Sequence, residues 1–347
     1  MKYRNIFLSI SFLITLLISC KESIVDPEEN LPAGRRDYIW DVTNLESPNG
    51  EGVWLSAIWG SSTQDIWAVG QASLSTYGIW HFNGTSWEKY HQTPGGGLSG
   101  LWGTANNNIW LGNVGGLLWH FNGSEWVFHS KLKIEGYEEF CIQKIWGLSE
   151  NEIYLLGAKT YGENPVEELG IFKYDGNSWK RINIPKLAKN GFVIYKDRAG
   201  DILFLTTEYG NNKISLYSWN GITLNTIFES ENQRLQLRRL GEKTVIIYGN
   251  KIYQYVNGKP ELIKDYSGVQ GNLGFSCCRN ENDIFLGLYS GSVIKLNHFN
   301  GEDLAEIYPL PPGWYPLQGM IFENDVYIII SDLNSNKTKI LHGKLKT

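Results

Sequence analysis

Apolar residues along this chain come in short runs, and many of these runs end at a turn that contains glycine. WHFNGTSWEKY from Trp80 and WHFNGSEWVFH from Trp119 are nearly the same stretch written twice. In both, Asn-Gly separates two apolar runs, which predicts a β-hairpin closed by a type I′ turn with positive φ at both central residues. Such pairs recur at intervals of roughly 40–50 residues, as in repeat proteins. They are Asn83-Gly84, Asn122-Gly123, Asp175-Gly176, Asn220-Gly221, Asn257-Gly258 and Asn300-Gly301, with His342-Gly343 as a weaker seventh.

A second pattern, an apolar strand, a polar turn and another apolar strand, runs in phase with the first. IWGSSTQDIWAVG from Ile58 recurs as LWGTANNNIWLGN from Leu101 and IWGLSENEIYLLG from Ile145. Divergent copies begin at Ile194, Gln236, Ser276 and Gly319. Each unit therefore predicts four strands, which is the blade of a β-propeller. Because one such unit cannot bury both of its faces, neighbouring units must stack and the ring must close.

The repeats predict an all-β fold, a seven-bladed β-propeller over residues 37–347 with four antiparallel strands per blade. The last unit is one strand short, whereas DYIWDVTN from Asp37 precedes the first unit without partners of its own. We expect this N-terminal segment to supply the outer strand of blade seven and close the ring. The units resemble the WG…DIWAVG…HFNGxxW repeats of secreted bacterial propellers and lipoproteins, closely in blades one to three. That resemblance implies the fold and no particular activity.

The first twenty residues are expected to direct secretion. Lys2 and Arg4 precede an apolar run from Ile6 to Ile18, which is too short to cross about 30 Å of hydrocarbon and is typical of a signal peptide. Leu17-Ile18-Ser19-Cys20 resembles the lipobox of bacterial lipoproteins. The resemblance implies a signal peptide over residues 1–19 and acyl lipid, such as palmitate, on Cys20. A plain signal peptide followed by a coincidental cysteine is the alternative.

Residues 20–36 are polar and contain proline, so they predict a flexible tether. Lys21 follows the cysteine, and in lipoprotein families a residue other than Asp there favours the outer membrane. The sequence therefore predicts a lipid-anchored protein of the bacterial cell envelope, at the outer membrane, with its periplasmic or surface orientation left open. The net charge of −5 comes without basic clusters, which argues against a nucleic-acid partner.

No catalytic, nucleotide-binding or metal-binding motif accompanies the repeats, so the sequence predicts no cofactor and no metal. An acid or amide precedes the second strand of most units, and we interpret these residues as caps for backbone N–H groups of turns; a ring of metal ligands is the alternative. Histidines that precede the Asn-Gly turns are interpreted as packing positions on separate blades. Cys141, Cys277 and Cys278 predict buried thiols. The turn residues are Asp65, Asn108, Glu152, Asp201, Asp283 and Asp325; the histidines are His81, His120 and His298.

The variable loops carry the candidate ligand-binding residues, because function usually lies on variable loops held by a rigid scaffold. Tyrosine and tryptophan combine apolar area with a hydrogen-bonding tip, which suits sugars and peptides. The same side chains are also consistent with anchoring of the loops. The candidates are Tyr77, Tyr137, Tyr161, Tyr209, Tyr266, Tyr289, Trp314 and Tyr315.

The sequence therefore favours a non-enzymatic binding or scaffold module that recognises a protein or a glycan through its loop-bearing face. Two alternatives stay open. A carbohydrate-active enzyme, a hydrolase or lyase, would need carboxylates at the channel mouth, about 5 Å apart for retaining and about 6.5–9.5 Å apart for inverting hydrolysis. An outer-membrane assembly factor rests on analogy with other lipoprotein propellers.

Overall fold

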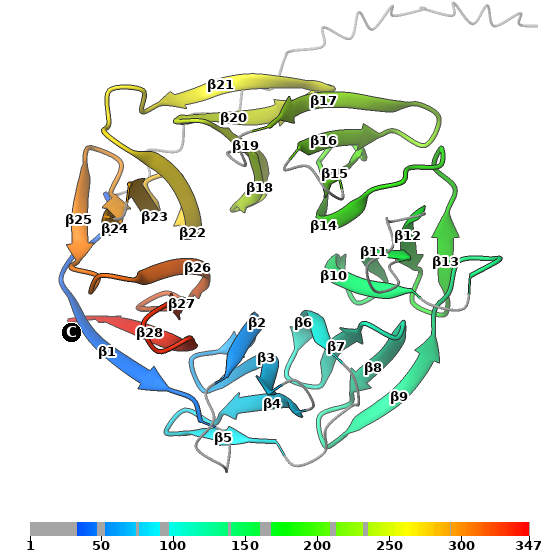
Figure 1. Ribbon diagram of the computed structural model, residues 1–347, viewed down its shortest axis with the longest axis horizontal. Helices are drawn as coiled ribbons and strands as arrows, with labels where there is room; N and C mark the ends of the chain where they lie inside the picture. Colours follow the sequence, from blue (N-terminus) through cyan, green and yellow to red (C-terminus); the bar gives the residue numbers. More distant parts are fainter. Residues whose placement is uncertain are drawn as a thin grey trace, which may run out of the picture. The chain divides into compact units, whose positions relative to one another are not determined.

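The computed structural model describes residues 33–46, 53–73, 76–90, 97–137, 140–159, 168–208, 213–231, 235–291 and 293–346. Residues Ala33–Thr347 form one compact unit, and each regular element described in it is a β-strand. The strands form seven antiparallel sheets of four, arranged as blades around a ring (Figure 1). The predicted seven-bladed β-propeller is therefore confirmed. The described residues contain no helix that is long and apolar enough to span a membrane.

Each of the first six blades uses four consecutive strands, ordered from the axis outward. Blade one has β2 Trp54–Ser62, β3 Asp65–Ser73, β4 Thr76–Phe82 and β5 Trp87–Lys89. Blade two has β6 Leu98–Ala105, β7 Asn108–Asn113, β8 Leu117–Phe121 and β9 Trp126–Lys131. Blade three has β10 Cys141–Ser149, β11 Glu152–Lys159, β12 Glu168–Tyr174 and β13 Trp179–Ile182. Blade four has β14 Asn190–Lys196, β15 Ile202–Thr207, β16 Ile214–Trp219 and β17 Leu224–Ser230.

Blade five has β18 Leu235–Leu240, β19 Lys243–Tyr248, β20 Lys251–Val256 and β21 Lys259–Asp265. Blade six has β22 Asn272–Asn280, β23 Asp283–Ser290, β24 Val293–Phe299 and β25 Leu304–Tyr308. Blade seven takes β26 Trp314–Ile321, β27 Asp325–Asp332 and β28 Lys337–Leu345 from the C-terminal end, and β1 Tyr38–Asn44 from the N-terminal end.

The N-terminal strand closes the ring, as the sequence predicts. All seven residues of β1 pair antiparallel with β28, from Tyr38 opposite Leu345 to Asn44 opposite Lys339. The closure extends back to Gly34, whose N–H lies 3.2 Å from the Asn282 carbonyl and 2.9 Å from the Asn300 carbonyl in blade six. The end of the predicted tether is therefore bonded to the ring. The predicted signal peptide, Cys20 and the rest of the tether lie outside the described residues.

The Asn-Gly hairpins lie where the sequence predicts, but most differ in conformation from the predicted type I′ turn. At Asn122, the side-chain oxygen accepts hydrogen bonds from the Ser124 and Glu125 N–H groups at 2.9 and 3.1 Å. Only Gly123 of that pair has a positive φ, 98°. The side chain replaces a backbone carbonyl in the turn, so asparagine itself keeps an ordinary φ. The same bonds recur at Asn83, Asp175, Asn220 and Asn300.

The two remaining predicted turns, at Asn257-Gly258 and His342-Gly343, differ from those five. Asn257 and Gly258 both have positive φ, 49° and 82°, as a type I′ turn requires. His342-Gly343 is not a turn, so that weaker prediction is wrong. Both residues lie inside β28, where Gly343 pairs with Trp40. A Cβ on Gly343 would lie 2.6 Å from the Trp40 ring, so this glycine makes room for a side chain of the closing strand.

The repeated aromatic residues pack between blades, as predicted. Trp67 of blade one is buried and meets Trp126 of blade two edge to face, with ring centroids 5.6 Å apart. The Trp-Gly pair of the inner strands has a related cause. A Cβ on Gly147 would lie 2.6 Å from the ring of Trp102 in the preceding blade. Trp102 and, in the same way, Trp59 therefore require a glycine one blade further on, at Gly147 and Gly103.

Candidate functional site

In four blades, a histidine of the third strand bonds to the acid or amide that begins the second strand. These contacts join neighbouring strands of one blade and leave the four histidines on separate blades. Each imidazole also packs on an aromatic ring: His81 stacks on Trp67 at 4.2 Å and His342 on Tyr327 at 4.2 Å. The pairs are His81–Asp65 at 2.7 Å, His120–Asn108 at 2.8 Å, His298–Asp283 at 2.8 Å and His342–Asp325 at 2.6 Å.

The packing role predicted for the histidines is confirmed, whereas the capping role predicted for the acids is wrong at Asp65. Its carboxylate accepts three side-chain hydrogen bonds, from Ser61, Trp67 and His81. Burial alone would raise the pKa of Asp65, but these hydrogen bonds outweigh it and lower the pKa. In the described part of the chain, no three His, Cys, Asp or Glu side chains gather to form a possible metal site. The histidine–acid pairs are structural links within blades.

His342 is the member of this set that sequence reasoning missed. Its ring lies opposite Asp325 across the β27–β28 pair, because Asp325 pairs with Lys344 and Tyr327 with His342. The acid and the histidine are 17 residues apart, against 16 for Asp65 and His81 and 15 for Asp283 and His298. That spacing is the signal that could have found it, had His342-Gly343 not been interpreted as a turn.

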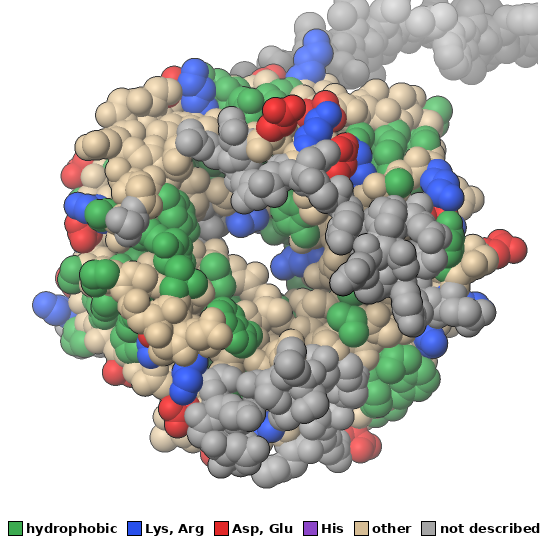
Figure 2. Space-filling model, in the orientation of Figure 1, with side chains coloured by type: hydrophobic (Ala, Val, Ile, Leu, Met, Phe, Trp, Pro, Cys, Tyr) green, Lys and Arg blue, Asp and Glu red, His purple; other side chains and the backbone are tan. Residues whose placement is uncertain are grey.

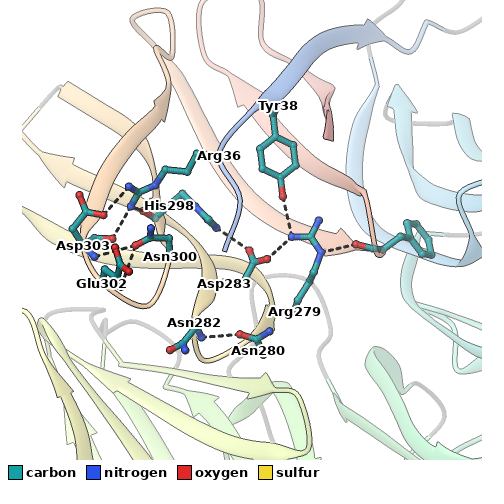
Figure 3. A network of polar contacts seen from close by, with 11 residues as sticks. Arg36, Tyr38, Arg279, Asn280, Asn282, Asp283, His298, Asn300, Glu302 and Asp303 are labelled. Carbon is teal, nitrogen blue, oxygen red and sulfur yellow. Dashed lines mark hydrogen bonds and ion pairs between the residues drawn. The ribbon is translucent and has the colours of Figure 1, made fainter. Parts of the chain in front are cut away.

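The most extensive polar network lies where the N-terminal strand meets blade six (Figure 3). The Arg279 guanidinium donates to the Tyr38 hydroxyl at 2.9 Å, to the Phe322 carbonyl at 2.8 Å and to the Asp283 carboxylate at 2.6 Å. The other Asp283 oxygen lies 2.8 Å from Nε2 of His298, whose side chain is fully buried. This network ties the closing strand to two blades.

The electrostatics of the network match a structural role. Burial works to lower the pKa of Arg279, but the Asp283 carboxylate and the Tyr38 hydroxyl outweigh it, so the pKa is raised. Burial raises the pKa of Tyr38 to about 12, although Arg279 opposes this. Both groups therefore keep one protonation state across the physiological range. A site that transfers protons would need at least one group with a pKa near neutrality.

The predicted ligand-binding aromatics whose side chains the structure describes lie at more than one place on the ring. Tyr137, in the segment after β9, accepts a hydrogen bond from Lys186 at 3.2 Å. Tyr266 packs on Phe299 between blades five and six, and burial raises the pKa of its hydroxyl. Tyr77 lies in β4, opposite Gln71, rather than in a loop, and its side chain is outside the described set. Tyr161 and Tyr209 lie outside the described residues.

Three candidates come together between blades six and seven. Tyr289 lies in β23, where the sequence predicts a loop, and its hydroxyl donates to the Pro316 carbonyl at 2.9 Å. Its ring stacks with that of Tyr315, with centroids 6.5 Å apart. Trp314 packs against the buried cluster of blade seven. Tyr266, Tyr289 and Trp314 therefore anchor loops and strand ends, which is the alternative role that the sequence left open.

Sequence reasoning also missed a cavity on the ring axis. It has a volume of 460 Å³ and is lined from six of the seven innermost strands, β2, β10, β14, β18, β22 and β26. Figure 2 shows the ring hollowed at its centre, with Lys and Arg side chains inside the opening. The polar lining residues are Lys144, Tyr195, Gln236, Arg238, Arg239 and Gln318.

The cavity also contains two of the three described cysteines. Cys277 and Cys278 lie on β22 and form no disulfide with one another. Burial raises the pKa of both thiols, to about 12 for Cys278. Cys278 donates a hydrogen bond to the Arg239 carbonyl at 3.3 Å. Cys141 is half-buried in β10. The predicted position of the thiols within strands is confirmed, whereas only Cys277 of the three is fully buried. The raised pKa values keep the thiols of Cys277 and Cys278 neutral, so they are poor nucleophiles.

Fold and cavity together define the class of the molecule: a seven-bladed β-propeller with a polar pocket on its axis. Solved propellers share this fold. YCF48 bound to a D1 peptide is 13% identical, with a TM-score of 0.61, and the match covers 91% of this chain and 100% of that one. YCF48 from Cyanidioschyzon merolae is 12% identical over 88% of this chain and 98% of its own, with a TM-score of 0.60.

Enzymes have the same fold as well. Virginiamycin B lyase from Staphylococcus aureus is 14% identical, with a TM-score of 0.58, over 89% of this chain and 100% of its own. Identities this low show a common fold and nothing further about activity. No protein-family model and no curated protein matches the chain.

Proposed function

We propose that this protein is a lipid-anchored binding module of the bacterial envelope, which holds a segment of a protein or a glycan and catalyses no reaction. The observation that carries the proposal is the axial cavity, whose 460 Å³ fall within the range of roughly 300–1,000 Å³ typical of ligand sites. Side chains from six blades converge on it, so the ring holds the binding groups rigidly.

Two further considerations support a binding role. Outside the cavity, the carboxylates of Asp65 and Asp283 accept hydrogen bonds from neighbouring side chains, so these polar groups stabilise blades. YCF48, a propeller of the same fold, is known in complex with a D1 peptide, which favours a protein segment as the ligand by analogy of fold. The repeats also resemble those of secreted bacterial propellers, which agrees with an envelope location.

Binding is tested by the melting temperature of the full chain, purified in detergent, against a panel of oligosaccharides and peptides. A ligand that binds only the folded state raises the melting temperature by an amount that grows with the logarithm of its concentration once this exceeds Kd. We expect at least one hit whose effect is weakened by the double variant Gln236→Ala, Gln318→Ala, because both amides line the cavity. Leu333→Ser, at a residue that is 55% exposed and not part of the lining, is the control. A panel without any hit would contradict the proposal.

The lipid anchor is tested separately by Cys20→Ala. Because the proposed acyl chains depend on this cysteine, the variant should lose incorporation of labelled palmitate and move from the membrane to the soluble fraction. Cys141→Ala, which changes a half-buried residue of β10, should keep both properties. A Cys20→Ala protein that still fractionates with membranes would show that the anchor is wrong, without affecting the binding proposal.

A further inference from the structure

The axial cavity gathers positive charge in a chain whose net charge is negative. Lys144 enters it from β10 in blade three, and Arg238 and Arg239 enter from β18 in blade five. No acidic side chain is among the described residues that line it. The whole chain nevertheless has 36 acidic residues against 31 basic ones, so the absence of acids here is not a consequence of composition.

Elsewhere, the chain places its partly buried cations against carboxylates. Lys196 lies 2.7 Å from Glu152, Lys189 lies 2.8 Å from Glu208, and Arg279 lies 2.6 Å from Asp283. Among the described acidic residues, none forms an ion pair with Lys144. Burying a cation without a counter-ion is costly, and a second cation nearby adds repulsion. An anion in the cavity would relieve both costs.

The position of Arg238 in the repeat also indicates a role other than packing. Trp59 pairs with Trp67 across the first hairpin of blade one, Trp146 with Tyr154 in blade three, and Arg238 with Val245 in blade five. In blade five, an arginine therefore takes the place that tryptophan has in the first three blades. Because that tryptophan packs between blades, its replacement by arginine removes apolar contact. It also places the hydrogen-bond donors of a guanidinium in the axial cavity.

We propose that the axial cavity binds an anionic group of the ligand, a carboxylate or a phosphate, between Lys144 and Arg238. This inference rests on the proposed binding function and specifies the charge of the ligand. The guanidinium of Arg238, which also donates to the Leu237 carbonyl at 3.0 Å, offers further N–H donors to such a group, and the ammonium of Lys144 contributes a compact charge from blade three. Gln236, Gln318 and Tyr195 supply further polar atoms to the same cavity.

Protonation of Lys144 makes the site sensitive to pH. Burial, reinforced by the neighbouring Arg238, lowers the pKa of Lys144 to about 8. The groups that face it from β14, β18 and β22 do not change charge near this pH. Burial raises the pKa of Tyr195, Cys277 and Cys278, so these groups stay neutral. Burial lowers the pKa of Arg238 from its usual 12.5, but a guanidinium keeps its charge near pH 8. Anion affinity should therefore fall as pH rises through about 8.

The test is calorimetric titration of the full chain in detergent with inorganic phosphate, citrate and hexaglutamate at constant ionic strength. Lys144→Gln and Arg238→Gln should each weaken binding about tenfold to a hundredfold, the range for losing a hydrogen bond to a charged group. Lys131→Gln, at an exposed position of β9, is the control and should change nothing. Lys144→Gln should also remove the pH dependence near 8. Melting temperatures of the ligand-free variants verify that each one is folded.

The three probes separate the sources of the anion. Binding of phosphate or citrate would support a free small anion, and binding of hexaglutamate alone would support an acidic peptide segment. If no anion binds, or if the two variants bind as well as the parent, the proposal is overturned. A neutral ligand from the wider panel that binds the parent and both variants equally would leave the binding function standing and remove only the anion site.

Discussion

Deletion of residues 37–45 should prevent the domain from folding stably. The deletion removes all of β1, so the seven residues of β28 opposite it lose their partners. Blade seven then has three strands, and β28 becomes an exposed sheet edge. It also removes Tyr38, which is buried and accepts a hydrogen bond from Arg279. Loss of a buried aromatic side chain alone costs about 3–5 kcal/mol, against a total stability of about 5–15 kcal/mol for a typical domain. Circular dichroism of the deleted protein should show no cooperative thermal unfolding transition.

Two neighbouring residues of β1 supply a matched pair for the same test. Tyr38→Ala should lower the melting temperature strongly, because this ring is 8% exposed and packs edge to face on Phe285. Ile39→Ala should have little effect, because Ile39 is 63% exposed on the other side of the strand. A synthetic peptide of residues 33–46 should restore the melt of the deleted protein. An unchanged melting temperature after deletion would show that the ring closes without β1.

Asp283→Ala should destabilise the propeller by about 3–5 kcal/mol, the cost of leaving a buried cation without its partner. The carboxylate is 8% exposed and bonds both Arg279 and the fully buried His298 (Figure 3). Its removal takes the counter-ion from Arg279, which keeps its bonds to Tyr38 and the Phe322 carbonyl, and takes the partner from Nε2 of His298. Chemical denaturation, with the midpoint and slope compared with those of the parent, measures the loss.

The conservative and exposed substitutions show whether the network is the cause. Asp283→Asn should recover part of the stability, because Asn108 bonds His120 in the same way in blade two. Asp303→Ala should cost at most about 1 kcal/mol, because its pair with Arg36 lies at the surface and its side chain is 65% exposed. Equal losses of stability in Asp283→Ala and Asp303→Ala would contradict a stabilising role for the network around Arg279, Asp283 and His298.

Much of the fold follows from local chemistry. An Asn-Gly or Asp-Gly turn is specified by a few adjacent residues, so the hairpin positions can be predicted even though the type I′ conformation was wrong at five of them. The Trp-Gly repeat similarly indicates stacked units before any partner is known. The number of blades and the closing role of residues 37–45 follow from counting those units, and the structure confirms both.

The site could not be obtained in the same way. Tyr289 is predicted to lie in a variable loop, yet the ladder with Asn272 extends β23 through it. The pairing of His342 with Asp325 was missed because His342-Gly343 was interpreted as a turn, although both residues lie inside β28 opposite β1 and β27. Acids interpreted as turn caps, such as Asp65 and Asp325, bond side chains across strands, and these partners become neighbours only when the sheet forms.

The sequence by itself determined the strands, their turns, the stacking of the units and the closure of the ring, because each depends on residues that are neighbours in the chain or recur with a fixed period. Only the tertiary structure decided what lies on the axis. Lys144 and Arg238 belong to different blades and different copies of the repeat, and neither stands out in the sequence. Closing the ring brings their side chains into one cavity, because the innermost strand of every blade faces the same axis.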